Sequence, residues 1–187
     1  MTNVKRAGTS LGGCLGLGCA LLLTGASSHP SGNPWGGAAA VLTADGIGPL
    51  RVGASLERAE RLAARLAPAG FYSGPGCAGL EEIRYDIRLG DAPVGVMAMA
   101  SDGWISEVEV SLHTPTRADT QGACVSLRDD FAQPFLGQFG PYVDQWQIDN
   151  PVSTELVART GPVMLAARWF ATGQTCYVSA RFGPPPD

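Results

Sequence analysis

A pattern that recurs after about 71 positions constrains this chain more than any other feature. The recurring landmarks are the dipeptides Ser55-Leu56 and Ser126-Leu127, the pairs Arg88/Gly90 and Arg159/Gly161, and the turns Asp102-Gly103 and Thr172-Gly173. Self-similarity at a fixed spacing indicates an internal duplication. We therefore expect two tandem copies of one unit, at residues 45–113 and 114–183.

Each copy is predicted to begin with a helix and to continue as three antiparallel strands. In the first copy, Ser55 is placed to cap a helix whose apolar residues recur with helical spacing, and Pro68 and Gly70 end it. Apolar and polar residues then alternate with the period of two that is typical of a half-buried strand. This alternation covers residues 83–89, 94–99 and 107–112.

The second copy is expected to repeat this order. Ser126 is its predicted N-cap, with Asp129 at the capping-box position, and Pro134 is expected to kink or end the helix. Strands are expected near 154–160, 163–171 and 174–182. The predicted fold class is therefore α+β, with two tandem copies of a helix followed by a three-stranded antiparallel sheet.

Residues 1–26 have the three parts of a secretory signal peptide. A short positive start precedes an uncharged apolar run over 11–23, and small residues follow it. This run is shorter than the roughly 20 residues that span a bilayer. We expect cleavage near Ala26 or Ser28, a flexible tether over 27–44, and a periplasmic or secreted product. A lipoprotein is the alternative, and only lipidation of the N-terminus would bring the chain to a membrane.

Composition excludes several classes of function. With 13 Lys and Arg against 17 Asp and Glu, the net charge of −4 offers no basic surface to a nucleic acid. The stretch 48–55 is similar to a phosphate-binding loop, but Ala54 stands where the lysine would be. No Cys-x-x-Cys or His-x-x-x-His spacing indicates a metal site. We expect no cofactor and no nucleic-acid partner.

Catalytic groups are sparse in this sequence. His113 is the one histidine outside the predicted tether, and no Gly-x-Ser-x-Gly motif occurs. A small hydrolase that uses His113 with Cys124, or with the pair Glu107 and Glu109, is kept as an alternative function. A junction histidine and a solvated strand face are the simpler interpretations of these residues. We therefore expect no enzyme activity.

Three cysteines remain after the predicted cleavage, at positions 77, 124 and 176. An exported chain favours one disulfide and one free thiol. We predict the pair Cys124–Cys176, because both positions lie in the second copy. Cys77–Cys176 is the rival pairing, and three buried thiols are the simplest alternative.

The strand alternation also predicts which side chains face away from the helices. Arginine beside aromatic residues is typical of protein interfaces. The open sheet face is therefore the candidate surface for binding a partner. Its predicted residues are Arg84, Arg88, Arg159, Arg168, Phe170, Tyr177 and Arg181. Tyr142 and Trp146 are further aromatic candidates, although aromatic residues are more often part of a core.

Two stretches carry a resemblance to known proteins. Residues 45–56 and 102–110 resemble the opening strand and turn, and the later hairpin, of small exported bacterial proteins of unknown activity. Tandem helix-plus-sheet copies are similar in architecture to the β-lactamase inhibitor protein, and single copies to the small lipoprotein of the outer-membrane assembly machine. The resemblance implies a scaffold without catalytic chemistry that binds other proteins through a sheet face.

The expected function is an exported, non-enzymatic module that binds a protein partner in the bacterial envelope or outside the cell. The small hydrolase is one alternative. A carrier of a small ligand, with a pocket between the two copies, is the other.

Overall fold

The computed structural model describes residues 37–66 and 70–184. The predicted signal peptide (1–26) and residues 27–36 of the predicted tether lie outside the described residues. The rest of that tether is folded, since it contains a 3-10 helix, η1 (Gly37–Ala40), and the strand β1 (Leu42–Thr43). Regular backbone therefore precedes the expected start of the first copy at residue 45.

A small antiparallel sheet leads into the first α-helix. Its order is β1-β2-β3, with β2 at Gly46–Ile47 and β3 at Leu50–Arg51. Gly48 has a φ of 54°, and a Cβ atom there would lie 2.7 Å from the carbonyl oxygen of Ala39. Only glycine fits this turn, so the glycines that mimic a phosphate-binding loop serve the backbone instead.

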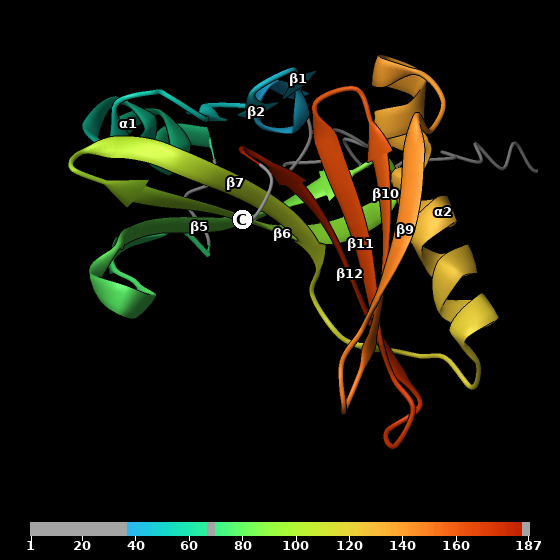
Figure 1. The fold of residues 1–187 in the computed structure, drawn as a ribbon. Coiled ribbons are helices and arrows are strands. Elements are labelled where there is room, and N and C mark those ends of the chain that lie inside the picture. Colours follow the sequence, from blue (N-terminus) through green and yellow to red (C-terminus); the bar gives the residue numbers. More distant parts are fainter. Residues whose placement is uncertain (1–36, 67–69, 185–187) are drawn as a thin grey trace, which may run out of the picture. The chain divides into compact units, whose positions relative to one another are not determined.

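A large antiparallel sheet contains the other nine strands (Figure 1). The strand order is β4-β5-β6-β7-β12-β11-β10-β9, and β8 pairs with the start of β12. The bounds are β4 (Tyr72–Pro75), β5 (Glu81–Leu89), β6 (Ala92–Ser101), β7 (Trp104–Leu112), β8 (Thr116–Arg117), β9 (Asp144–Asp149), β10 (Thr154–Thr160), β11 (Val163–Phe170) and β12 (Thr175–Phe182). A short 3-10 helix, η2 (Cys77–Gly79), lies between β4 and β5.

The predicted fold class is wrong. Strands dominate the described residues, with twelve strands in two sheets and two α-helices. Each expected three-stranded region has a fourth strand that was not predicted, β4 in the first and β9 in the second. The two expected sheets are also one, since β7 pairs with β12 along Val108–Ser111. This pairing satisfies backbone groups that two separate sheets would leave free at two more edges. The duplication itself stays a prediction.

The alternation of apolar and polar residues correctly predicts six strands: β5, β6, β7, β10, β11 and β12. In β5, for example, Ile83, Tyr85 and Ile87 are buried, whereas Arg84 and Asp86 are exposed. Successive side chains of a strand point to opposite faces, so one face of the sheet joins the core and the other stays open.

Two α-helices contribute to the core on the buried face. The first, α1 (Leu56–Leu66), directly follows Ser55, as predicted, and buries Ala59 and Ala63. The second, α2 (Gln121–Phe139), packs on β10, β11 and β12 (Figure 1). Neither of these described helices is long and apolar enough to cross a lipid bilayer. We call α1 with β4–β7 the first half, and α2 with β9–β12 the second half.

The start of α2 differs from the prediction, and Pro134 does not end the helix. Thr120 is the N-cap, and its hydroxyl accepts a hydrogen bond from the backbone N–H of Ala123 at 3.1 Å. Ser126 therefore lies inside the helix, where its hydroxyl donates to the carbonyl of Gly122. Pro134 also lies inside α2, which continues to Phe139. Tertiary packing of this helix outweighs the local signals at both positions.

Candidate binding groove on the open sheet face

The open face of the second half, together with the adjoining strand β7 of the first half, carries three rows of side chains that run across the strands. The outer row is Tyr177, Arg168, Glu155 and Ile148, from β12 to β9. The floor row is Ser111, Ser179, Ala166, Val157 and Trp146, from β7 to β9. The inner row is Glu109, Arg181, Met164, Arg159 and Asp144, also from β7 to β9. Strand register sets neighbours in a row directly side by side.

The floor row lies lower than the rows that flank it, because serine and alanine have short side chains. Ser111, Ser179 and Ala166 occupy three adjacent strands, and the next residue, Val157, is only 5% exposed. Together with Phe170, the three rows line a hollow of about 800 Å3. We call this hollow the groove. Trp146, on the edge strand β9, stands at one end of its floor.

The outer wall of the groove combines an ion pair with two stacked aromatic rings. A guanidinium nitrogen of Arg168 lies 3.1 Å from a carboxylate oxygen of Glu155. The rings of Phe170 and Tyr177 meet edge to face, with centroids 5.5 Å apart. Tyr177 is 51% exposed, so an amphipathic ring stands free at this wall. Such a tyrosine offers a large contact area at low entropic cost.

The inner wall is built around Arg181. Its Nε lies 3.3 Å from Oε1 of Glu107, and one of its terminal nitrogens lies 3.8 Å from Oε2 of Glu109. Neither contact is an aligned hydrogen bond, and Oε1 of Glu107 has no hydrogen-bond partner within the described ranges. Burial raises the pKa of Glu109, and the nearby Arg181 partly opposes this shift.

Arg159 supplies an unpaired positive charge in the groove. It lies opposite Asp144 in the sheet, yet no carboxylate among residues 37–66 and 70–184 comes within 4.0 Å of its guanidinium. An exposed guanidinium without an internal partner is free to bind a carboxylate from outside. The groove therefore offers a floor of short or apolar side chains, two walls that carry both signs of charge, and the unpaired guanidinium of Arg159.

Five of the predicted partner-binding residues line this groove. They are Arg159, Arg168, Phe170, Tyr177 and Arg181. The other two, Arg84 and Arg88, also face the open side but lie on β5, which β6 and β7 separate from β12. Arg84 pairs with the buried Glu82, and Arg88 donates to the carbonyl of Asp91. The structure therefore does not bring Arg84 and Arg88 to the groove.

Sequence reasoning missed the β9 side of the groove. Trp146 was only one aromatic candidate among several, and Ile148 was not considered. A signal was present, because Trp146 and Ile148 alternate with glutamines over 144–149. The strand was missed because it is polar on its other face and all six of its residues are exposed.

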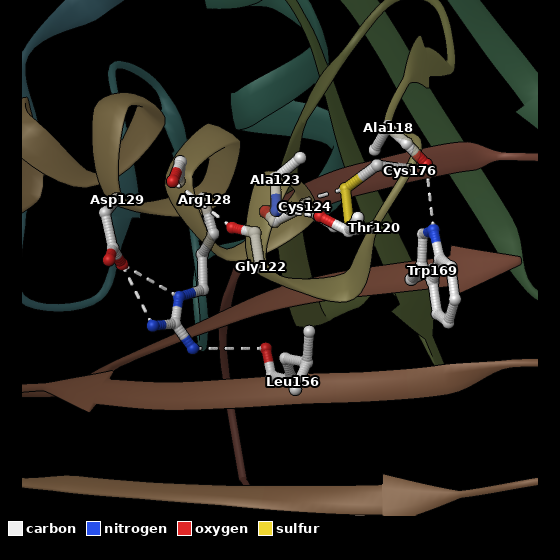
Figure 2. Close-up of a disulfide and its surroundings, with 11 residues drawn as sticks. Ala118, Thr120, Gly122, Ala123, Cys124, Arg128, Asp129, Leu156, Trp169 and Cys176 are labelled. Carbon is white, nitrogen blue, oxygen red and sulfur yellow. Dashed lines mark hydrogen bonds and ion pairs between the residues drawn. A yellow bond between two sulfur atoms is a disulfide. The ribbon is translucent and has the colours of Figure 1, made fainter. Parts of the chain in front are cut away.

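The predicted disulfide is confirmed. Cys124 of α2 and Cys176 of β12 are bonded, with Cα atoms 5.5 Å apart, on the helix-covered face of the sheet (Figure 2). The rival pairing is excluded, since Cys77 is exposed and unpaired. The disulfide also leaves Cys124 without a thiol for the hydrolase alternative.

The remaining groups of that hydrolase alternative do not converge. Nε2 of His113 lies 3.6 Å from Asp86 on β5, whereas Glu107 and Glu109 contact Arg181 on β12. His113 instead lies over Gly95, where its ring is 3.7 Å from the position of an added Cβ. No group of three His, Cys, Asp or Glu side chains suited to a metal occurs in the described part of the chain.

A polar network behind the groove ties the second half together (Figure 2). Arg128 of α2 is 3% exposed, and it donates to the carbonyl of Leu156 on β10 and to the side chain of Gln145 on β9. It also pairs with Asp129 at 2.9 Å, and its guanidinium lies 5.4 Å from the ring centre of Tyr142. Since these strands carry the groove on their other face, the network holds the floor in place.

Comparison with protein family models, curated proteins and solved structures finds no match for this chain. The resemblance to small exported bacterial proteins, the β-lactamase inhibitor protein and the assembly lipoprotein therefore stays a prediction.

Proposed function

We propose that this protein is an exported, non-enzymatic module that binds another protein in the bacterial envelope or outside the cell, through the groove. The floor of short side chains between walls of arginine and aromatic residues carries this proposal. Arginine and aromatic residues contribute most to the affinity of protein interfaces, and a hollow gives them a shape to fit.

The dimensions of the groove suit a segment of polypeptide chain. Its floor crosses five strands, a length of about 19 Å, and its walls stand four residues apart along each strand, about 13 Å between backbones. Arg168 and Arg181 in the walls are paired with carboxylates, and Asp144 lies opposite the unpaired Arg159 in the sheet, so no strong net charge selects a purely acidic or basic partner. We expect the bound segment to place an apolar side chain on the floor and a carboxylate near Arg159.

Export is supported by two independent features. The sequence of residues 1–26 has the parts of a signal peptide, and a Cys124–Cys176 disulfide is stable in an oxidising compartment. Mass spectrometry of the protein from its native host tests this, because export predicts a new N-terminus near Ala26 or Ser28. An uncleaved, cytosolic product would contradict export without affecting the groove.

Site-specific cross-linking tests the proposed binding. A photoreactive phenylalanine at Tyr177 is expected to capture one protein from envelope extract or culture medium. Tyr72 on β4 is a matched control, because it is also an exposed tyrosine but lies outside the groove. Capture at Tyr177 is expected to fall at least about tenfold in Arg168→Glu with Trp146→Ala, which removes about 1.4 kcal/mol or more of binding. Equal capture at both tyrosines, or capture that survives these substitutions, would overturn the proposal.

The size of the groove also favours a second candidate, a carrier of a small ligand. A volume of about 800 Å3 lies within the range of small-molecule sites. Native mass spectrometry of the protein purified from its host distinguishes the two functions. A stoichiometric small molecule that leaves on Trp146→Ala supports the carrier, and an empty groove supports the protein-binding module.

A further inference from the structure

The strand β9 is an open edge of the large sheet. It is hydrogen-bonded to β10 alone, and no strand among the described residues covers its other side. All six residues of β9 are exposed, and the strand contains neither proline nor lysine. The opposite edge strand, β4, is shorter and ends in Pro75. Exposed edges without such protection are templates for a further strand.

The hydrogen-bond phase of the β9–β10 hairpin identifies the free backbone groups. The N–H of Asn150 donates to the carbonyl of Ser153 at 2.9 Å, so this pair closes the hairpin. In an antiparallel ladder, the residues bonded to the neighbouring strand alternate with residues that face away. The backbone N–H and carbonyl groups of Gln145, Gln147 and Asp149 therefore point outward from the sheet.

Side-chain contacts already hold β9 in the extended form. Gln145 accepts a hydrogen bond from Arg128 at 3.1 Å, and Gln147 accepts one from Gln121 of α2 at 2.7 Å. Asp149 accepts hydrogen bonds from Gln147 and from Thr154 of β10. A strand that is fixed before it binds loses less conformational entropy on pairing.

We propose that β9 pairs antiparallel with β9 of a second copy of this chain, around a two-fold axis at Gln147. This register uses the outward groups of Gln145, Gln147 and Asp149 of both copies. It sets Trp146 opposite Ile148 of the second copy, and symmetry repeats this apolar pair. Both side chains are exposed in the single chain, and both lie on the open face.

Charge also selects this register. It places Asp149 opposite Gln145 of the second copy and Asp144 opposite Asn150, so no two acids face each other. A shift by one residue would set Asp144 against Asp149 and would present the wrong backbone groups. A register centred on Trp146 would set Asp144 against Ile148. The sequence of β9 is thus complementary to itself in the register centred on Gln147.

The dimer would join two large sheets into one, with both grooves on the same face. One strand pair buries less surface than the roughly 1,200 Å2 of stable complexes, so we expect a concentration-dependent dimer. This inference goes beyond the proposed function, because it requires no ligand in the groove.

Cysteine cross-linking tests the register directly. In a Cys77→Ser background, Gln147→Cys is expected to form an intermolecular disulfide under mild oxidation, because residue 147 faces itself across the axis. Gln145→Cys is the matched control, since it faces residue 149 and is expected to stay monomeric. Adding Asp149→Cys to Gln145→Cys is expected to restore the cross-link. Equal cross-linking of Gln145→Cys and Gln147→Cys, or none by Gln147→Cys, would overturn the proposal.

Sedimentation of the mature chain provides the second measurement. Dimer is expected to increase with concentration, and Gln147→Pro is expected to abolish it, because proline removes an outward N–H and keeps the bonds to β10. Circular dichroism verifies that this variant is folded. A monomer at every concentration, or a dimer that survives Gln147→Pro, would contradict pairing through β9. Gln147 does not line the groove, so capture of a partner at Tyr177 is expected to persist in Gln147→Pro, and this combination lets the two proposals fail separately.

Discussion

The two halves of the molecule share a strand order but differ in how their helices are attached. In the first half, α1 has 11 residues and buries only Ala59 and Ala63. In the second half, α2 has 19 residues and buries five side chains. A disulfide and the Arg128 network also tie α2 to its strands, whereas Cys77 of the first half forms no disulfide.

The open faces of the halves also differ, because the second half carries most of the groove. In the second half, short side chains form the floor of the groove. In the first half, Gly95 continues the floor row beside Ser111, but the ring of His113 lies over it. The half with the groove is thus the half that is covalently and electrostatically braced. A fixed floor preserves the shape of a binding site, because a packed scaffold holds its side chains in place.

Removal of the disulfide from the second half is expected to lower the stability of the protein more than any other change. Replacement of Cys124 and Cys176 by alanine opens a closed loop with a sequence separation of 52 residues. On the chain-entropy model, this lowers the free energy of unfolding by about 4 kcal/mol. Urea denaturation measures the change, with Cys77→Ala as the control that leaves stability nearly unchanged. A loss below about 1 kcal/mol would show that the disulfide does not brace the second half.

Removal of Arg128 is expected to have the next largest effect. Arg128→Met leaves the carbonyl of Leu156 and the side chain of Gln145 without their donor, so the free energy of unfolding is expected to fall by about 3 kcal/mol. Arg61→Met on α1 is the matched control, because Arg61 forms only an exposed pair with Glu57. Its expected loss is below about 0.5 kcal/mol. Similar losses in both variants would remove the distinction between the helices.

Two tyrosines are expected to respond with opposite signs. The hydroxyl of Tyr85 in the first half is buried, and no described residue bonds to it, so Tyr85→Phe is expected to stabilise the fold by about 1 kcal/mol. The hydroxyl of Tyr142 donates to Asp129 at 2.8 Å, so Tyr142→Phe is expected to destabilise it by about 1 kcal/mol. Thermal unfolding of both variants checks this, and a shared sign would refute the assignment.

Tyr142 also makes the stability of the protein sensitive to alkali. Burial and the hydrogen bond to Asp129 raise the pKa of Tyr142 to about 12. Because the folded pKa exceeds the unfolded one, the folded state holds this proton more tightly. Its stabilisation is therefore present below about pH 10 and is lost as the pH rises through the folded value. Tyr142→Phe is expected to reduce this loss, and identical profiles between pH 9 and 11 would contradict the shift.

The smallest expected effect concerns Glu109 in the groove wall. Its pKa is raised by burial, so folding favours its protonated form, and that stabilisation is lost as the pH rises from below the unfolded pKa through the folded one. Glu109→Gln keeps the neutral shape, and its stability relative to the wild type is expected to increase over this range. Urea denaturation at a pH below the unfolded pKa of glutamate and at neutral pH measures the difference, with Glu81→Gln as an exposed control.

Much of the strand content could be predicted from local patterns. Alternation is a property of neighbouring residues, and it placed Arg168 and Tyr177 on the open face. The strand β9 was not predicted, because its polar face bonds to Gln121 and Arg128 of α2, and no local sequence pattern contains these contacts. The N-cap of α2 at Thr120 was not predicted, because serine has the higher capping propensity and Ser126 was therefore the better local candidate.

The sequence by itself determined six strands, their faces and the first helix, because periodicity and capping are local properties. It favoured the Cys124–Cys176 pairing, and the structure excluded the rival pairing with Cys77. Only the tertiary structure decided that β7 pairs with β12. That pairing joins residues about 70 positions apart in the chain and depends on the register of many hydrogen bonds together. The groove follows from this register, because its floor aligns Ser111 with Ser179, Ala166 and Val157 across four strands.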